Sequence, residues 1–194
     1  MVSMNTLKGA GAQQLQKPTM WWKGMEYMQV AIRLICLAGS TAALACMVTA
    51  RQSGNLEFYG FKLPLRSNWS FSLSFRYLVG ISGLAIAHSF FLLLFGTFRV
   101  LRKSPVIPSR SYAWFAFAAD QVMAYAMIGA GAAASGVTNL NRTGVEHTAL
   151  PNFCKPLGTF CNHVAASIAF TFLSSFLLAA SAIVEVIWLS QPAG

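Results

Sequence analysis

Charge is scarce in this sequence. Lysine, arginine, aspartate and glutamate together make up 10% of the 194 residues, whereas a soluble domain typically carries roughly a quarter. Only five residues are acidic, and 56% of the chain is hydrophobic. The mean hydropathy of +0.55 is higher than one ordinary globular core requires. The composition therefore argues against a soluble protein.

Other missing patterns exclude further classes. No apolar run alternates with period two, which argues against a membrane β-barrel. Almost no polar stripes follow the runs, which argues against a soluble helical bundle. We expect no cleavable signal peptide, because the first 20 residues are polar and mixed and the first apolar run is too long for a signal. The chain lacks a His-Glu-x-x-His motif, a convincing nucleophile with its base and a metal-ligand cluster, so we predict neither an enzyme nor a cofactor.

The net charge of +9 does not indicate a nucleic-acid partner. The basic residues are spread over segments that flank the apolar runs, whereas a nucleic-acid binder gathers them into one patch. Basic residues in flanking positions are typical of contacts with anionic lipid headgroups. We therefore predict lipid contact and no nucleic-acid binding.

Long apolar runs are what the chain has in abundance. Four of them occupy residues 27–50, 75–98, 113–136 and 164–189. At about 1.5 Å of rise per residue, each run forms a helix long enough to cross roughly 30 Å of hydrocarbon. We predict an all-α membrane protein, a four-helix transmembrane bundle that occupies residues 27–189. Residues 1–26 and 190–194 are predicted to be tails on one side of the membrane, because four crossings return the chain to its starting side.

Basic residues near the helix ends indicate the orientation, because lysine and arginine collect on the cytoplasmic side. Seven lie in the N-terminal segment and the middle loop, namely Lys8, Lys17, Lys23, Arg99, Arg102, Lys103 and Arg110. Five lie in the other two loops, namely Arg51, Lys62, Arg66, Arg142 and Lys155. This bias predicts cytoplasmic termini. An aromatic belt at the inner interface agrees with it, formed by Trp21, Trp22, Tyr112, Trp114 and Trp188.

The two loops predicted to lie outside carry signals for covalent modification. Asn68-Trp-Ser and Asn141-Arg-Thr are acceptor motifs for N-glycans. Cys154 and Cys161 share the second outer loop. On the oxidising side of the membrane we expect them to form a disulfide, with two free thiols as the alternative.

Two ionisable residues lie deep within the predicted spans. Arg33 lies about 9 Å into the first helix and Asp120 about 10 Å into the third, by helical rise from the cytoplasmic ends. An unpaired charge at such a depth costs about 2.5–3.5 kcal/mol or more. Arg33 alone could extend its long stem to the headgroups, but the Asp120 side chain is too short. We predict an ion pair between Arg33 and Asp120 that packs the first helix against the third.

His88 and Glu185 are further ionisable residues in the spans. His88 lies in the middle of the second helix, where it either relays protons or donates a hydrogen bond to a neighbouring helix as a neutral imidazole. Glu185 lies near the inner end of the fourth helix and is expected to reach the headgroup region. Glycine, alanine and serine at helix-packing spacing predict close helix contacts, within one copy or between copies.

Four short motifs resemble a known family. They are Ala31-Ile-Arg33-Leu in the first helix, Phe75-Arg-Tyr-Leu-Val79 in the second, Ala118-Ala-Asp120-Gln in the third, and Phe153-Cys154 with Phe160-Cys161-Asn162-His163-Val164-Ala165-Ala166-Ser167 before and into the fourth. In this order and spacing they resemble the Casparian strip membrane domain (CASP) proteins of land plants. The chain is most similar to the CASP-like members, with a distant similarity to MARVEL-type tetraspan proteins.

The resemblance implies a plasma-membrane protein that associates with itself and with CASP-family relatives, as homodimers, heterodimers or larger assemblies. The founding members form membrane platforms that restrict lateral diffusion and position secreted enzymes that modify the cell wall. Residues 51–66 lack the acidic and aromatic signature that the founding members carry in the first outer loop. A CASP-like role is therefore expected instead of a role at the Casparian strip itself.

Two functions follow from these observations. A non-catalytic scaffold should have few ionisable groups in its spans, short loops and small-residue faces, and the sequence shows all three. The alternative is a small transporter or channel subunit, in which Arg33, Asp120 and His88 form a polar path through the membrane.

Overall fold

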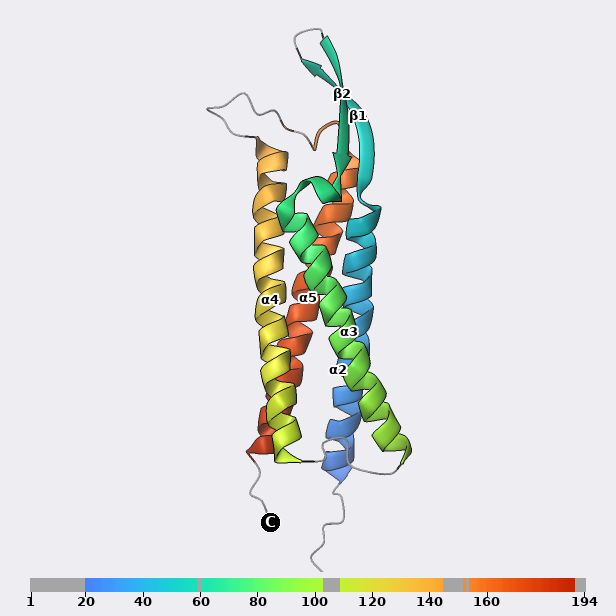
Figure 1. Ribbon diagram of the computed structural model, residues 1–194, viewed down its shortest axis with the longest axis vertical. Coiled ribbons are helices and arrows are strands. Elements are labelled where there is room, and N and C mark those ends of the chain that lie inside the picture. Colours follow the sequence, from blue (N-terminus) through green and yellow to red (C-terminus); the bar gives the residue numbers. More distant parts are fainter. Residues whose placement is uncertain (1–19, 59–60, 103–108, 145–151, 153, 191–194) are drawn as a thin grey trace, which may run out of the picture.

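The computed structural model describes residues 20–58, 61–102, 109–144, 152 and 154–190. Within them lie four long helices, α2 (Met20–Thr49), α3 (Leu73–Leu101), α4 (Arg110–Thr143) and α5 (Gly158–Leu189). Each helix is long and apolar enough to cross a membrane. They lie side by side in one bundle (Figure 1). The prediction of a four-helix membrane protein is confirmed.

Each helix begins before its apolar run. α2 begins at Met20, inside the segment expected to be an N-terminal tail. Ser109 caps the start of α4, because its hydroxyl oxygen accepts a hydrogen bond from the Tyr112 backbone N–H at 3.2 Å. α4 ends at Thr143 and is capped by Gly144, whose φ of 69° lies in the region that glycine adopts most readily.

The helices form a ring in which α2 and α4 lie on a diagonal. α5 packs against both α2 and α4, and α3 packs against the same two helices. At the end of the bundle where α2 begins, here called the tail end, the Arg110 guanidinium donates a hydrogen bond to the Leu189 carbonyl at 2.8 Å. This bond fastens the start of α4 to the last turn of α5, where a cation is favourable because the carbonyls there have no partners within the helix.

Gly39 allows α2 to approach α5 closely. A Cβ atom built at Gly39 would lie 2.7 Å from the Ser174 hydroxyl oxygen and 4.0 Å from the Ser174 Cβ. Both residues face the centre of the bundle, and Ser174 is fully buried. Small residues at such contacts provide packing that the hydrophobic effect does not supply between helices in lipid.

We expect Gly39→Ala to lower the free energy of unfolding by about 1–3 kcal/mol, because the added methyl overpacks the contact with Ser174. The double variant Gly39→Ala with Ser174→Ala should recover most of this loss, since it removes the oxygen that the methyl would strike. Thermal unfolding of the purified protein in detergent measures both effects. Equal losses of unfolding free energy in the single and double variants would show that a clash with the Ser174 hydroxyl is not the cause of the destabilisation.

Two clusters of buried apolar side chains fill the bundle. The larger lies at the end opposite the tail end and draws on all four helices, with Met47, Ala50, Phe75, Leu78, Ala130, Ala134, Leu157, Phe160, Val164 and Ile168. The smaller lies closer to the tail end and consists of Cys36, Ala85, Ala124, Met127 and Leu178. Beyond the smaller cluster, toward the tail end, the buried residues include charged ones.

A β-hairpin, which the sequence analysis does not predict, occupies the connection between α2 and α3. Strands β1 (Arg51–Phe58) and β2 (Phe61–Asn68) are antiparallel and pair from Arg51 opposite Asn68 to Phe58 opposite Phe61. The hairpin projects beyond the ends of the helices (Figure 1), and this end of the bundle is called the hairpin end below. A short 3-10 helix, η1 (Trp69–Phe71), leads from β2 toward α3.

The base of the hairpin rests on the loop before α5. A disulfide joins Cys154 to Cys161, with 5.8 Å between their Cα atoms. The Gln52 side-chain oxygen of β1 accepts a hydrogen bond from the Phe160 N–H at 2.9 Å. Gly54 lies so close that an added Cβ would be 3.1 Å from the Pro156 carbonyl oxygen. The hairpin and the disulfide loop therefore pack as one unit at the hairpin end.

Candidate functional site: an ionic cluster inside the bundle

Arg33 and Asp120 meet in the centre of the bundle. The Arg33 Nη1 lies 3.2 Å from the Asp120 Oδ1, and the Nη2 lies 3.0 Å from the Oδ2. The guanidinium thus binds both carboxylate oxygens, the arrangement in which Arg–carboxylate pairs are strongest. Asp120 is fully buried and Arg33 is 6% exposed. The structure brings the predicted partners together.

The pair differs from the prediction in where it acts. We predicted that the pair packs the first helix against the third. This is wrong, because α2 and α4 lie on a diagonal and are not adjacent. The long Arg33 side chain instead crosses the interior of the bundle to reach Asp120. The Arg33–Asp120 ion pair thus joins two helices that lie across the bundle from each other, and it fixes their distance across the ring of four helices.

Glu185 of α5 is the third charged member, and the expectation that it reaches the headgroups is wrong. Its Oε1 lies 2.8 Å from the Arg33 Nη2, and the residue is 2% exposed. Gln29, one turn before Arg33 on α2, donates hydrogen bonds to the Glu185 Oε1 at 3.1 Å and to the Ser181 hydroxyl at 3.0 Å. The physical reason is that a carboxylate buried in lipid is stabilised by a guanidinium, and Arg33 has donors for two carboxylates.

His88 of α3 completes the cluster. Its Nε2 lies 2.7 Å from the Asp120 Oδ1, so the imidazole donates a hydrogen bond to the carboxylate. This geometry matches one of the two interpretations of His88, a hydrogen bond to a neighbouring helix. All four helices therefore contribute to the cluster: Gln29 and Arg33 from α2, His88 from α3, Asp120 from α4, and Ser181 and Glu185 from α5.

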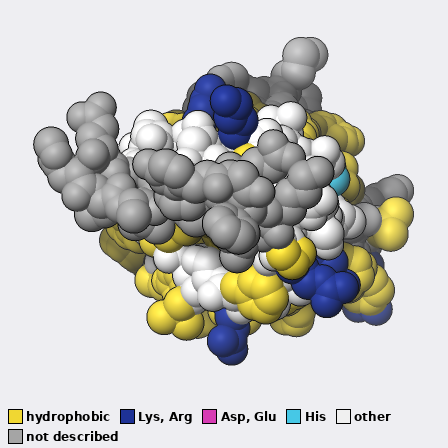
Figure 2. Space-filling view, turned by 90° about the horizontal axis from the view of Figure 1, so that it is seen from above, with side chains coloured by type: hydrophobic (Ala, Val, Ile, Leu, Met, Phe, Trp, Pro, Cys, Tyr) yellow, Lys and Arg dark blue, Asp and Glu magenta, His cyan; other side chains and the backbone are white. Residues whose placement is uncertain are grey.

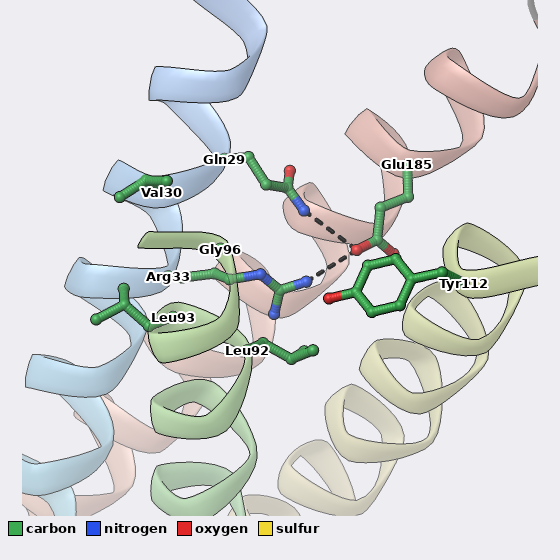
Figure 3. Close-up of a pocket in the computed structure, with 8 residues that line it drawn as sticks. All are labelled: Gln29, Val30, Arg33, Leu92, Leu93, Gly96, Tyr112 and Glu185. Carbon is green, nitrogen blue, oxygen red and sulfur yellow. Dashed lines mark hydrogen bonds and ion pairs between the residues drawn. The ribbon is translucent and has the colours of Figure 1, made fainter. Parts of the chain in front are cut away.

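A small cavity borders the cluster on its tail-end side. It has a volume of ≈ 20 Å³ and is lined by Gln29, Val30, Arg33, Leu92, Leu93, Gly96, Tyr112 and Glu185 (Figure 3). Two oxygens of its lining, the Gln29 Oε1 and the Glu185 Oε2, are buried without a hydrogen-bond partner. A cavity of this size holds about one water molecule, which could donate to such oxygens. Tyr112, expected in the aromatic belt, thus lies partly inside the bundle.

The electrostatics of the cluster favour mutual bonding over reactivity. It contains one guanidinium, which is always charged, and two carboxylates. A proton on His88 or on Glu185 would make the cluster electrically neutral. Neutrality matters at this depth, because an uncompensated charge is far more costly in hydrocarbon than in water. The arrangement joins four helices at one level and engages both Nη atoms of Arg33 and both carboxylate oxygens of Asp120 within the cluster.

The remaining predicted site residues lie at the hairpin end. The disulfide joins the two cysteines for which it was predicted. The Asn68 side-chain oxygen accepts a hydrogen bond from the Ser70 N–H at 3.4 Å and caps η1. Asn141 lies in the last turn of α4, and its carbonyl accepts a hydrogen bond from the Cys154 N–H at 3.2 Å. Glycosylation of Asn68 and Asn141 stays a prediction.

These features define a class: the chain is a multi-pass membrane protein whose four helices are joined by a buried ionic cluster. Comparison with known families gives the particular family. The family model of the Casparian strip membrane protein domain matches residues 22–177, so the chain belongs to the CASP family, and the resemblance is confirmed. The match includes Arg33, His88 and Asp120, whereas Glu185 lies beyond its end.

Curated relatives are similar over most of the chain. CASP-like protein 3A1 of Populus trichocarpa is 62% identical over 183 residues, which cover 94% of this chain and 81% of the relative. CASP-like protein 3A2 of the same species is 66% identical over 166 residues, covering 86% and 79%. CASP-like protein 3A1 of Oryza sativa subsp. japonica is 49% identical over 170 residues, covering 88% and 83%. No solved structure matches the chain.

Proposed function

We propose that the protein is a self-associating, non-catalytic scaffold of the plasma membrane, which organises a membrane subdomain and positions machinery that modifies the cell wall. Its partners are further copies of itself, CASP-family relatives, membrane lipids and secreted cell-wall enzymes. Its termini lie in the cytoplasm, and the hairpin and the disulfide loop face the outside of the cell.

The observation that carries this proposal is the self-contained bonding of the ionic cluster. Arg33 binds both carboxylates, and His88 binds Asp120. These contacts use the groups that a transporter would offer to a substrate. They instead fix the mutual positions of four helices, which suits a protein that presents a rigid surface to its neighbours.

The outer surface of the helices supports self-association. Large apolar side chains cover much of it, and four glycines interrupt them: Gly80 and Gly83 on α3, Gly129 and Gly136 on α4. A Cβ atom at any of these glycines would meet nothing within 4 Å, so their space is not used within one copy. Small residues on a lipid-facing surface allow a helix of another copy to approach closely.

The transporter alternative is less well supported. A path through Arg33, Asp120 and His88 would have to continue toward the hairpin end, where the two apolar clusters fill the bundle. Among the described residues, the cavity next to these groups lies on their tail-end side and has room for about one water molecule.

Fluorescence recovery after photobleaching of the tagged full-length protein in plant cells tests the proposal. We expect patches at the plasma membrane that recover slowly. Gly80→Leu combined with Gly129→Leu should speed recovery, because the new side chains occupy the outer surface without a clash inside the monomer. Leu84→Ile, an exposed change on the same helix, is the matched control and should leave recovery unchanged. Even distribution and free diffusion of the unaltered protein would contradict the proposal.

A further inference from the structure

The hairpin end of the molecule is cationic. Five basic side chains are exposed there: Arg51, Arg66, Arg76, Arg142 and Lys155. Seen from this end, lysine and arginine side chains lie at several places around the surface, and no acidic side chain is visible among those coloured by type (Figure 2). In the sequence, residues 50–76 and 137–163 contain six basic and two acidic residues.

This charge is unusual for the side on which we place it. Loops that face away from the cytoplasm are normally poor in lysine and arginine, because these residues retain a loop inside. The excess therefore suggests a binding role outside the cell. Exposed cations without described acidic neighbours favour an anionic partner, because opposite charges attract and steer association at such surfaces.

An open cavity lies at this end. Its volume is ≈ 160 Å³, and it lies between the hairpin, the last turn of α4 and the disulfide loop. The residues that line it are Leu65, Arg66 and Ser67 of β2, Asn141 of α4, and Leu157, Phe160 and Cys161, of which Leu157 and Phe160 are buried. The residues at this cavity thus carry a guanidinium, a hydroxyl, an amide and apolar side chains.

These groups match the chemistry of a carboxylated sugar. A guanidinium binds a carboxylate with two parallel hydrogen bonds. The hydroxyl and the amide can donate to and accept from sugar hydroxyls. Apolar side chains suit the C–H face of a sugar ring, as in other small-molecule sites that combine an apolar wall with a few polar groups.

Further cations continue the site beyond the cavity. Arg142 follows Asn141 in the chain, and Lys155 lies in the disulfide loop that supplies Leu157. Both are exposed. A polymer with a carboxylate on successive units would meet them on either side of the cavity.

We propose that this cavity binds a uronic acid unit of an acidic polysaccharide of the cell wall, with Arg66 as the carboxylate-binding residue. The inference rests on the proposed function, because it requires the hairpin end to face the outside. It gives the scaffold a direct attachment to the wall polymer next to the membrane.

Isothermal titration of the purified full-length protein, in nanodiscs of neutral lipid, tests the proposal. The probes are short oligomers of galacturonate and the same oligomers with methyl-esterified carboxyls. We expect the acid to bind and the methyl ester to bind at least tenfold more weakly, because the ester lacks the charge that Arg66 recognises. This comparison uses unaltered protein and does not depend on the folding of a variant.

Two variants locate the binding. Arg66→Gln should weaken binding of the acid about tenfold or more, since it removes the charge-assisted pair. Arg76→Gln removes the same charge from the same end but outside the cavity lining, and should leave the affinity within about twofold. An equal effect of both variants would show diffuse charge attraction and overturn the site, and so would equal binding of acid and ester or no binding.

Three further measurements separate the alternatives. Thr143→Ala abolishes the glycan acceptor motif but keeps Asn141, and should leave binding in place. Loss of binding in nanodiscs with anionic lipid would assign the cavity to lipid headgroups and overturn the proposal. If the protein forms plasma-membrane patches but does not bind the galacturonate oligomers, this inference is rejected and the scaffold proposal stands. If it binds the oligomers but forms no patches, the scaffold proposal is rejected. We also expect a membrane-impermeant amine reagent to label Lys155 on intact cells. Failure of this labelling would place the cavity on the cytoplasmic side and overturn the proposal.

Discussion

Replacing Arg33 with glutamine should destabilise the protein more than any other single change in the ionic cluster. The variant leaves Asp120 and Glu185 buried without their shared cation. Removing one partner of a buried ion pair costs about 3–5 kcal/mol, and here one change deprives two carboxylates. We expect a free energy of unfolding lower by about that amount, measured by thermal unfolding in detergent, and poor accumulation at the membrane.

The other single variants should form a graded series. Asp120→Asn breaks the two-point bond to Arg33 but leaves the guanidinium paired with Glu185, so its effect should be smaller. Glu185→Gln should be mildest, because Arg33 and Asp120 then remain as a neutral pair. Counting the charges left uncompensated separates Arg33→Gln from the other two changes. Asp120→Asn ranks above Glu185→Gln because Asp120 makes the two-point bond to Arg33 and also accepts from His88.

The triple variant Arg33→Gln, Asp120→Asn, Glu185→Gln provides the decisive control. It contains three changes but leaves no charge in the cluster, so it should be more stable than Arg33→Gln alone. Such non-additivity is expected only for residues that interact. If Arg33→Gln unfolds at the temperature of the unaltered protein and accumulates normally, the cluster does not hold the bundle together.

Removing the disulfide should produce the second largest loss. Cys154→Ser with Cys161→Ser opens the loop on which the hairpin rests, and the chain-entropy treatment of so short a loop gives about 2–3 kcal/mol. The expected result is a lower unfolding temperature and faster proteolysis within residues 51–68. Helical content measured by circular dichroism should stay unchanged, because the four spans do not depend on the loop.

Reduction offers an independent check on the same bond. Unaltered protein treated with a thiol reductant should unfold at the temperature of the double serine variant. Cys46→Ser is the matched control, since Cys46 is a free thiol in α2 and its removal leaves the disulfide intact. A double serine variant that matches the unaltered protein in unfolding temperature and protease resistance would show that the loop is held by its packing alone.

Part of the structure follows directly from the sequence. The four spans were predictable because a run of about 20 apolar residues has few alternatives to a membrane helix. The meeting of Arg33 and Asp120 was predictable because depth along a helix follows from residue number, and the two residues fall at similar depths. The chain belongs to the family that its short motifs indicated.

The errors came from quantities that residue number does not encode. Depth says nothing of which helices are neighbours, so the diagonal arrangement of α2 and α4 was missed. Glu185 was assigned to the headgroups because it lies near a helix end, although Ser181, one turn earlier, faces the same way. Gln29 and Arg33 have the same i, i+4 spacing on α2. The two pairs, Ser181 with Glu185 and Gln29 with Arg33, each place two polar side chains on one helix face, and this was the available signal that Glu185 points into the bundle. For the hairpin the sequence offers apolar residues at every second position, Phe61, Leu63 and Leu65, but Pro64 between them argues against a central strand.

The cluster has a consequence for how the chain is synthesised. Arg33 is joined to Asp120 across 87 positions and to Glu185 across 152 positions. During translation α2 therefore enters the membrane long before either carboxylate exists, and its guanidinium has no carboxylate partner until α4 emerges. A nascent chain interrupted before α4 would expose this charge within the bilayer, and one interrupted before α5 would lack its second carboxylate; the cell's degradation machinery could distinguish such unfinished copies from complete ones by this difference.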